Sequence, residues 1–201
     1  MARKLIYVRI IHGQADLGSF AERLTAMAQE RLSAEAWRAH QRQTQEFWRK
    51  LGAKVMERVS EELAGRSWTR LRIYQDGMPA AGETARRIVE ELAEKGSLNY
   101  QLVQELMAKG AQLERTEQAD LLRQEYRLLR GILAASEPAE RDRARQQYAR
   151  ASEGLLARRD RFIAQQIAGT LREGEVGLLF IGALHRVADY LSKDIEVIPV
   201  A

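Results

Sequence analysis

The fold is decided first by residues 176–185, which read Val-Gly-Leu-Leu-Phe-Ile-Gly-Ala-Leu-His. The apolar run lacks the alternation of a half-exposed strand, which is typical of a parallel strand that is buried on both faces. Residues 5–11, Leu-Ile-Tyr-Val-Arg-Ile-Ile, form a second run of this kind, and His12 follows it. Two such strands far apart in the chain predict the parallel sheet of an α/β protein.

Three shorter strand signals extend the predicted sheet to four or five strands. They are residues 71–74, residues 111–114 and residues 195–200. Pro199 favours an edge or terminal position for the last of these, because proline cannot donate a hydrogen bond to a neighbouring strand.

Between the strands, apolar residues recur with the period of 3.6 residues that helices show. Ser19 and Glu22 form a capping box at the start of a first helix. Further helices are predicted at residues 33–65, 81–95, 98–109, 116–135 and 136–172, and Ser33, Ser97 and Thr116 are the predicted N-caps of three of them.

This alternation predicts one domain over residues 1–201, with a mostly parallel sheet flanked by helices on both faces and right-handed crossovers. The helices within residues 116–172 make a long excursion between two strands. We expect part of this excursion to project as an arm or a dimerisation hairpin. The alternative is a helical cap over the sheet.

Composition excludes several classes of protein. The chain of 201 residues contains no cysteine, which excludes disulfide scaffolds, thiol catalysis, iron–sulfur clusters and the common structural zinc sites. The beginning of the chain lacks the apolar stretch of a signal peptide, and the longest apolar run is too short to span a bilayer. We therefore expect a cytoplasmic protein without a membrane span.

The net charge of +4 raises the question of nucleic-acid binding. The excess of arginine is concentrated between residues 137 and 172, and elsewhere the two signs are interspersed. No recognised nucleic-acid-binding motif accompanies this charge, so a nucleic-acid partner is not favoured.

Two of the three histidines, His12 and His185, directly follow the two clearest strands, whereas His40 falls inside an amphipathic helix. Ligands of open parallel sheets bind beyond the carboxyl ends of the strands. The placement therefore predicts that both imidazoles share one site. The alternative is that each ring only forms a hydrogen bond with the backbone of its own loop.

Acidic residues follow the same strand ends: Asp16 after His12, Asp76 after residues 71–74, and Glu117 after residues 111–114. Structural alternatives are an Asx-turn for Asp76 and a favourable helix dipole for Glu117. Together with the histidines, these carboxylates are suitable ligands for Zn²⁺, Mn²⁺ or Fe²⁺ and suitable bases for activating water. We expect His12, Asp16 and His185 as metal ligands.

Arg161 completes the predicted site. It belongs to the run Arg158-Arg159-Asp160-Arg161 on the helix that precedes the strand ending at His185. A guanidinium can bind a carboxylate or phosphate in bidentate fashion or stabilise an oxyanion. The alternative is a solvated helix face with pairing inside the helix. No Walker loop, dinucleotide-binding glycine motif or serine-hydrolase elbow is present in the sequence.

The segment Gly182-Ala-Leu-His185 resembles the G-x-x-H strand end of the superfamily that contains the TraB pheromone-shutdown proteins, Tiki metalloproteases, erythromycin esterases and a haem-uptake protein. Residues 5–12 are similar to its N-terminal counterpart, and residues 159–164 resemble its arginine helix. The resemblance implies a metal-assisted hydrolase fold with two histidines, a glutamate and an arginine. This chain departs from the pattern with Arg9 in place of glycine and Gln75-Asp76 in place of the glutamate.

Two hypotheses of function follow. The first is a metal-assisted hydrolase that acts on a small molecule or peptide, with His12, His185, Asp76, Glu117 and Arg161 as catalytic residues. The second is a protein that binds or senses a small molecule in the same crevice without turnover and forms a homodimer through its long helices.

Overall fold

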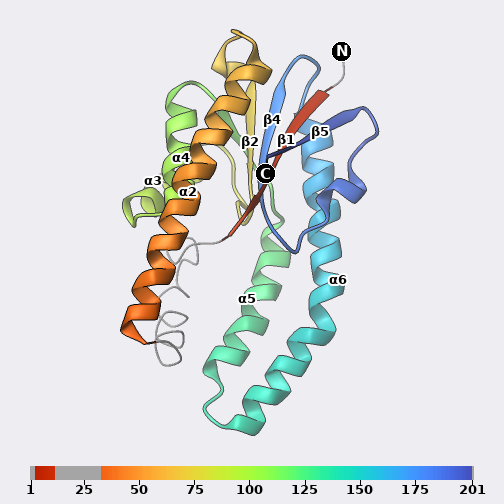
Figure 1. Ribbon diagram of the computed structural model, residues 1–201. Helices are drawn as coiled ribbons and strands as arrows, with labels where there is room; N and C mark the ends of the chain where they lie inside the picture. Colours follow the sequence, from red (N-terminus) through yellow and green to blue (C-terminus); the bar gives the residue numbers. More distant parts are fainter. Residues whose placement is uncertain (1–2, 12–32, 201) are drawn as a thin grey trace.

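The computed structural model describes residues 3–11 and 33–200, and it contains a five-stranded sheet in the order β3-β2-β4-β1-β5 (Figure 1). Every pairing in the sheet is parallel. The strands are β1 (Arg3–Ile10), β2 (Leu71–Gln75), β3 (Gln112–Glu114), β4 (Val176–Gly182) and β5 (Ile195–Val200). The predicted α/β class is confirmed, including the short strand before residue 115.

The helices lie between the strands, as the periodicity predicts. They are α2 (Ala34–Leu63), α3 (Gly82–Glu94), α4 (Leu98–Ala108), α5 (Ala119–Ala134) and α6 (Pro138–Thr170), with short 3₁₀ helices η2 (Trp68–Arg70) and η3 (Val187–Tyr190). Ser33 and Ser97 act as N-caps, because their hydroxyl oxygens accept hydrogen bonds from the backbone N–H groups of Ala36 and Tyr100. The helix predicted at Ser19 lies outside the described residues.

The predicted capping role of Thr116 is wrong. Helix α5 begins three residues later, at Ala119. The Thr116 hydroxyl instead accepts a hydrogen bond from the backbone N–H of Gln75 at 2.9 Å. Thr116 therefore joins the segment after β3 to the end of β2 rather than starting a helix.

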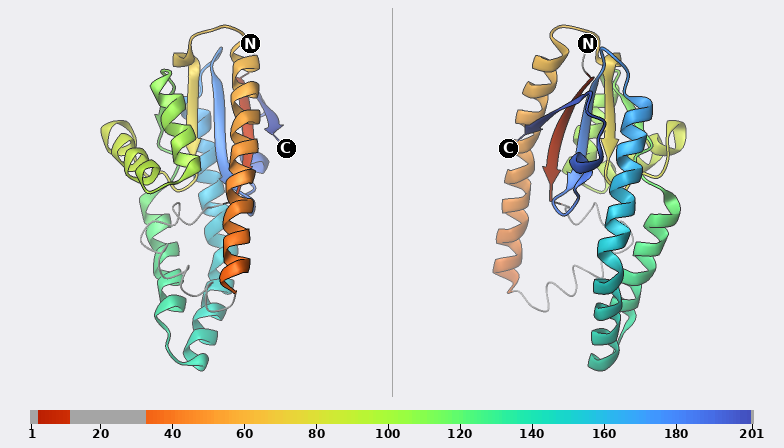
Figure 2. Two further views of the ribbon diagram at one scale, coloured as in Figure 1. Left: turned by 60° about the vertical axis from the view of Figure 1, so that its left-hand side comes forward. Right: turned by 90° about the vertical axis from the view of Figure 1, so that its right-hand side faces the viewer.

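Helices cover both faces of the sheet, as Figure 2 shows for α2 and α6. On one face, α2, α3 and α4 bury apolar side chains such as Val55, Val89 and Val103 against the strands. On the other face, Ile163 and Ile167 of α6 pack in a second buried cluster. The two clusters bury apolar surface on both sides of the sheet, which is the main contribution to its stability.

The central strand β4 is buried along almost its whole length. A Cβ atom added at Gly177 would lie 2.7 Å from Cδ1 of Leu5 and 3.2 Å from Cδ2 of Leu171. Glycine is therefore required where β4 passes between β1 and the end of α6. At the edge of the sheet, β5 is more exposed and carries Pro199, as the sequence predicts.

Helices α5 and α6 form the predicted long excursion between β3 and β4, and their hairpin extends beyond the carboxyl edge of the sheet (Figure 1). Close to the sheet, the hairpin buries Leu121, Leu122 and Leu155. Its role in dimerisation stays a prediction. Within the described ranges, no helix is long and apolar enough to cross a membrane.

Candidate functional site

Three of the predicted residues meet at the carboxyl edge of the sheet. Asp76 directly follows β2, Glu117 lies three residues beyond β3, and His185 lies three residues beyond β4. Each offers a ligand atom, and these atoms all lie within 4.8 Å of one another. All three residues are buried. The adjacency of β3, β2 and β4 in the sheet brings them together.

Backbone hydrogen bonds hold the loops that carry this group. The N–H of Asp76 donates to the carbonyl of Phe180 in β4 at 2.9 Å, which continues the pairing of β2 with β4. The N–H groups of Thr116 and Glu117 both donate to the carbonyl of Met78 at 2.9 Å. These hydrogen bonds fix the backbone that carries the acidic side chains relative to the end of β4 and to the loop after β2.

Asp76 occupies the middle of the group. Its Oδ1 accepts a hydrogen bond from Nη2 of Arg159 at 2.8 Å, and its Oδ2 accepts one from the backbone N–H of Gly182 at 3.0 Å. Nε2 of His185 lies 3.7 Å from the same Oδ2. Asp76 therefore faces a cation on one side and an imidazole on the other.

Arg159 of α6 contacts three carboxylates at once. Besides Asp76, it contacts Oε1 of Glu117 at 2.5 Å and Oε2 of Glu125 at 2.6 Å. Its side chain is only 7% exposed. Burial alone lowers the pKa of Arg159, but the hydrogen bonds and charges of Glu117, Asp76 and Glu125 raise it above its ordinary value. The guanidinium is a permanent positive charge in this site.

His185 is held by Asp160, the residue that follows Arg159 in α6. Nδ1 of His185 lies 2.5 Å from Oδ1 of Asp160, while Oδ2 accepts a hydrogen bond from the backbone N–H of Arg186 at 2.9 Å. In the tautomer in which Nδ1 donates to Asp160, Nε2 is the ring nitrogen that can act as a ligand, and it faces Asp76. The same arrangement orients histidine ligands in many metal sites.

The group contains more negative than positive charge. Three carboxyl groups, from Asp76, Glu117 and Glu125, contact the guanidinium of Arg159, and a fourth, from Asp160, contacts His185. Burial raises the pKa of the Glu117 carboxyl, against the opposing hydrogen bond and charge of Arg159. Buried charge without a counter-charge is costly. The excess can be neutralised by a proton on Glu117 or by a divalent cation.

The arginine in this group is Arg159, so the prediction of Arg161 from the sequence is wrong for this position. Arg161 is exposed, and its guanidinium carbon lies 5.4 Å from the centre of the Tyr190 ring. The period of α6 explains the difference: Leu155 and Ile163 point to the core, and Arg159 lies halfway between them, one turn from each. The same periodicity in the sequence could have identified Arg159, although nothing in the local sequence indicates that Glu125 reaches it.

His12 and Asp16 lie outside the described residues, so the predicted convergence of the two strand-end histidines stays a prediction. Strand β1 does run beside β4, with Ile10 in register with Gly182. The described part of β1 therefore ends at the same edge of the sheet as β4. His40 falls within α2, as expected.

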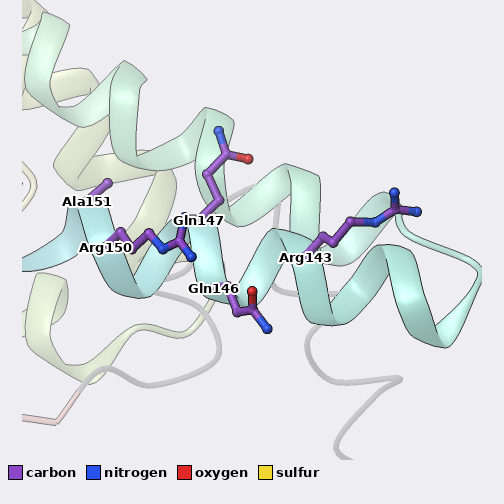
Figure 3. Close-up of a pocket in the computed structure, with 5 residues that line it drawn as sticks. All are labelled: Arg143, Gln146, Gln147, Arg150 and Ala151. Carbon is purple, nitrogen blue, oxygen red and sulfur yellow. The ribbon is translucent and has the colours of Figure 1, made fainter.

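A separate cavity of about 480 Å³ lies along the outer half of α6 (Figure 3). Its described lining residues all belong to this helix: Arg143, Gln146, Gln147, Arg150 and Ala151. None of them contributes to the group around Asp76. The cavity is therefore a different feature from the candidate site.

Comparisons of this chain with protein-family models, with curated proteins and with solved structures found no match. The family resemblance proposed from the histidine motifs is therefore neither supported nor contradicted by them.

Proposed function

We propose that this protein is a metal-assisted hydrolase whose metal is held by Asp76, Glu117 and His185. The observation that carries the proposal is the contact between Asp160 and Nδ1 of His185, because it leaves Nε2 free to serve as a ligand beside two carboxylates. An imidazole nitrogen with carboxylate oxygens is a donor set that suits Zn²⁺, Mn²⁺ or Fe²⁺.

The charge of the site supports the same proposal. A divalent cation offsets the excess of carboxylates over the guanidinium of Arg159. Its binding also displaces protons, because the ligands must be deprotonated. A bound divalent ion would supply the Lewis acidity that activates water for attack on an ester or amide.

The chain's own residues have separate roles in this proposal. Arg159 holds the carboxylates of Asp76 and Glu117 in place, and Asp160 orients His185. Glu117, as a ligand of the metal, must be deprotonated, and a bound cation would offset the burial that raises its pKa. The substrate is a small molecule or a peptide.

Elemental analysis of the purified protein, combined with hydrolysis assays on ester and peptide probes, tests the proposal. We expect bound divalent metal in the wild type, and its loss in Asp76→Asn and His185→Ala. Asp160→Asn should lower metal affinity about 10- to 100-fold, because it weakens the hold on Nδ1 without removing a ligand.

The matched control is Glu175→Gln, which alters a half-buried carboxylate paired with another arginine, Arg72. It should leave metal content and turnover unchanged. Equal metal content in the wild type and in His185→Ala would contradict the proposal.

A binding protein without turnover is the second candidate. It is favoured by one observation, that Arg159 already pairs with Asp76 and Glu117. Such pairing occupies carboxylate oxygens that a metal would use. Binding of a small molecule without product formation, in protein that contains no metal, would favour this candidate.

A further inference from the structure

The side of the candidate site formed by β1, α6 and η3 differs in charge from the site itself. Arg9, near the end of β1, is exposed, and no carboxylate in the described ranges contacts it. Arg161 of α6 is also exposed and lies over Tyr190 of η3, with no ion pair to any described residue. Two guanidinium groups thus remain available beside an acidic group.

Tyr7 lies on the same face of β1 as Arg9. Its side chain is on the α6 face of the sheet, in one buried cluster with Ile163 and Val187. Burial raises the pKa of the Tyr7 phenol; Arg9 lowers it, and Asp160, Asp189 and Asp76 raise it further. Arg9 lies two residues after Tyr7 in β1 and is in register with Ile181 of β4, so its side chain is on the same face of the sheet as Tyr7, Ile181 and Val187 of η3.

The hydroxyl of Tyr7 has no hydrogen-bond partner among residues 3–11 and 33–200. Since its pKa is raised, it remains protonated and can donate a hydrogen bond. A donor of this kind, with Arg9 and Arg161 nearby, matches the requirements of an anionic oxygen group. The third arginine on this side, Arg186, is different because Asp189 already pairs with it at 2.9 Å.

We propose that Arg9, Arg161 and Tyr7 bind an anionic group of the substrate, so that the enzyme hydrolyses esters or amides that carry a carboxylate or phosphate beside the scissile bond. This inference rests on the proposed hydrolase function. In the reaction, water adds across the ester bond, the acyl C–O bond breaks, and the acid and the alcohol are released. The anionic substituent itself is unchanged.

The physical reason is electrostatic. The buried group has an excess of carboxylates, which repels a negatively charged substrate unless cations lie at its approach. Arg9 and Arg161 supply these cations without neutralising the ligands, because they are exposed and separate from Asp76 and Glu117. The exposed side chains of Tyr190 and Leu184, both in the segment between β4 and β5, provide apolar contact for the rest of the substrate.

The test compares two probes of similar acyl length, 4-nitrophenyl butyrate, which is neutral, and mono-4-nitrophenyl glutarate, which carries a carboxylate. With Mn²⁺ or Zn²⁺ present, we expect wild-type protein to prefer the glutarate. Arg9→Met and Arg161→Met should each raise KM for the glutarate about tenfold, which corresponds to the loss of one charge-assisted hydrogen bond, with kcat within twofold.

Tyr7→Phe should raise the same KM several-fold. Both arginines are exposed, so their variants should keep the melting temperature of the wild type. Arg186→Met is the matched control and should leave KM for both probes unchanged. Inhibition by inorganic phosphate, compared with inhibition by acetate, shows whether phosphate or carboxylate is the preferred anion.

The outcomes separate this inference from the function on which it rests. Hydrolysis of both esters with no preference, unchanged in Arg9→Met and Arg161→Met, overturns the anion site and leaves the hydrolase. If neither ester is hydrolysed, calorimetric titration with glutarate and with inorganic phosphate decides. Saturable binding that both arginine variants weaken supports the anion site, and the absence of binding overturns it.

Discussion

Two arginine networks lie on the α6 face of the same sheet, and they differ in charge and in the pKa shifts of their carboxyl groups. Arg72 of β2 contacts Glu114 at 2.5 Å and Glu175 at 2.8 Å. Arg159 contacts three carboxylates, and Asp160 and His185 adjoin them. The Arg72 network thus has two carboxylates for one cation, whereas the Arg159 network has four.

The pKa values of the carboxyl groups reflect this difference. At Glu175, burial raises the pKa, but the hydrogen bond and charge of Arg72 outweigh it and the net effect is a lowered pKa. At Glu117, burial outweighs Arg159 and the pKa is raised. The first network is an ion pair that stabilises the fold. The second retains an excess of buried acid, which is typical of functional sites.

The largest expected difference is in stability. Arg159→Met should cost about 3–5 kcal/mol of unfolding free energy, because it leaves several buried carboxylates without their cation. Arg72→Met should cost about 1–3 kcal/mol, since Glu114 and Glu175 are less deeply buried than Asp76 and Glu117 and can be hydrated. Urea unfolding at neutral pH measures both values. Equal losses would show that the two networks are equivalent.

The second largest expected difference between the two networks is the gain in stability when metal is added. At a free Mn²⁺ or Zn²⁺ concentration of 100 times Kd, binding stabilises a folded protein by about 2.7 kcal/mol. We expect this gain in the wild type and in Glu175→Gln, and its loss in Glu117→Gln and His185→Ala. Thermal unfolding with metal and with a chelator measures it. A gain that persists in His185→Ala would place the metal elsewhere.

The pH dependence of stability should have opposite signs in the two networks. The raised pKa of Glu117 means that its contribution is present below the unfolded value of 4.5 and is lost as the pH rises through its folded pKa. The lowered pKa of Glu175 means that its contribution is present above 4.5 and is lost as the pH falls through its folded pKa.

Glu117→Gln should therefore reduce the loss of stability on the alkaline side, and Glu175→Gln should reduce the loss on the acid side. Each slope is at most about 1.4 kcal/mol per pH unit, because one proton is involved. Urea unfolding between pH 3 and pH 8, with a chelator present, tests both variants. Slopes of the same sign would contradict the assignment.

The smallest expected effect concerns Arg161, two residues from Arg159 on the same helix. Arg161→Ala removes an exposed contact with the Tyr190 ring and should cost under about 1 kcal/mol. The comparison with Arg159→Met tests whether burial, and not residue type, sets the contribution of an arginine on α6. A cost for Arg161→Ala near that of Arg159→Met would contradict it.

Much of the site could be predicted from the sequence because parallel strands bring their carboxyl ends to one edge. Asp76, Glu117 and His185 each follow a recognisable strand, so their meeting needed only the alternation of strands and helices. Arg159 was missed because the choice within the run of arginines depends on which face of α6 is buried. Glu125 was missed because its contact joins two helices of the hairpin.

Local sequence patterns are sufficient to predict the strands, most of the helices and the α/β class, since these depend on apolar periods and on capping residues such as Ser33 and Ser97. The order of the strands, the burial of Arg159 and the pairing of His185 with Asp160 emerge only when the chain is folded. Periodicity and caps act over a few residues, whereas the burial and charge of a side chain depend on neighbours that lie far away in the chain.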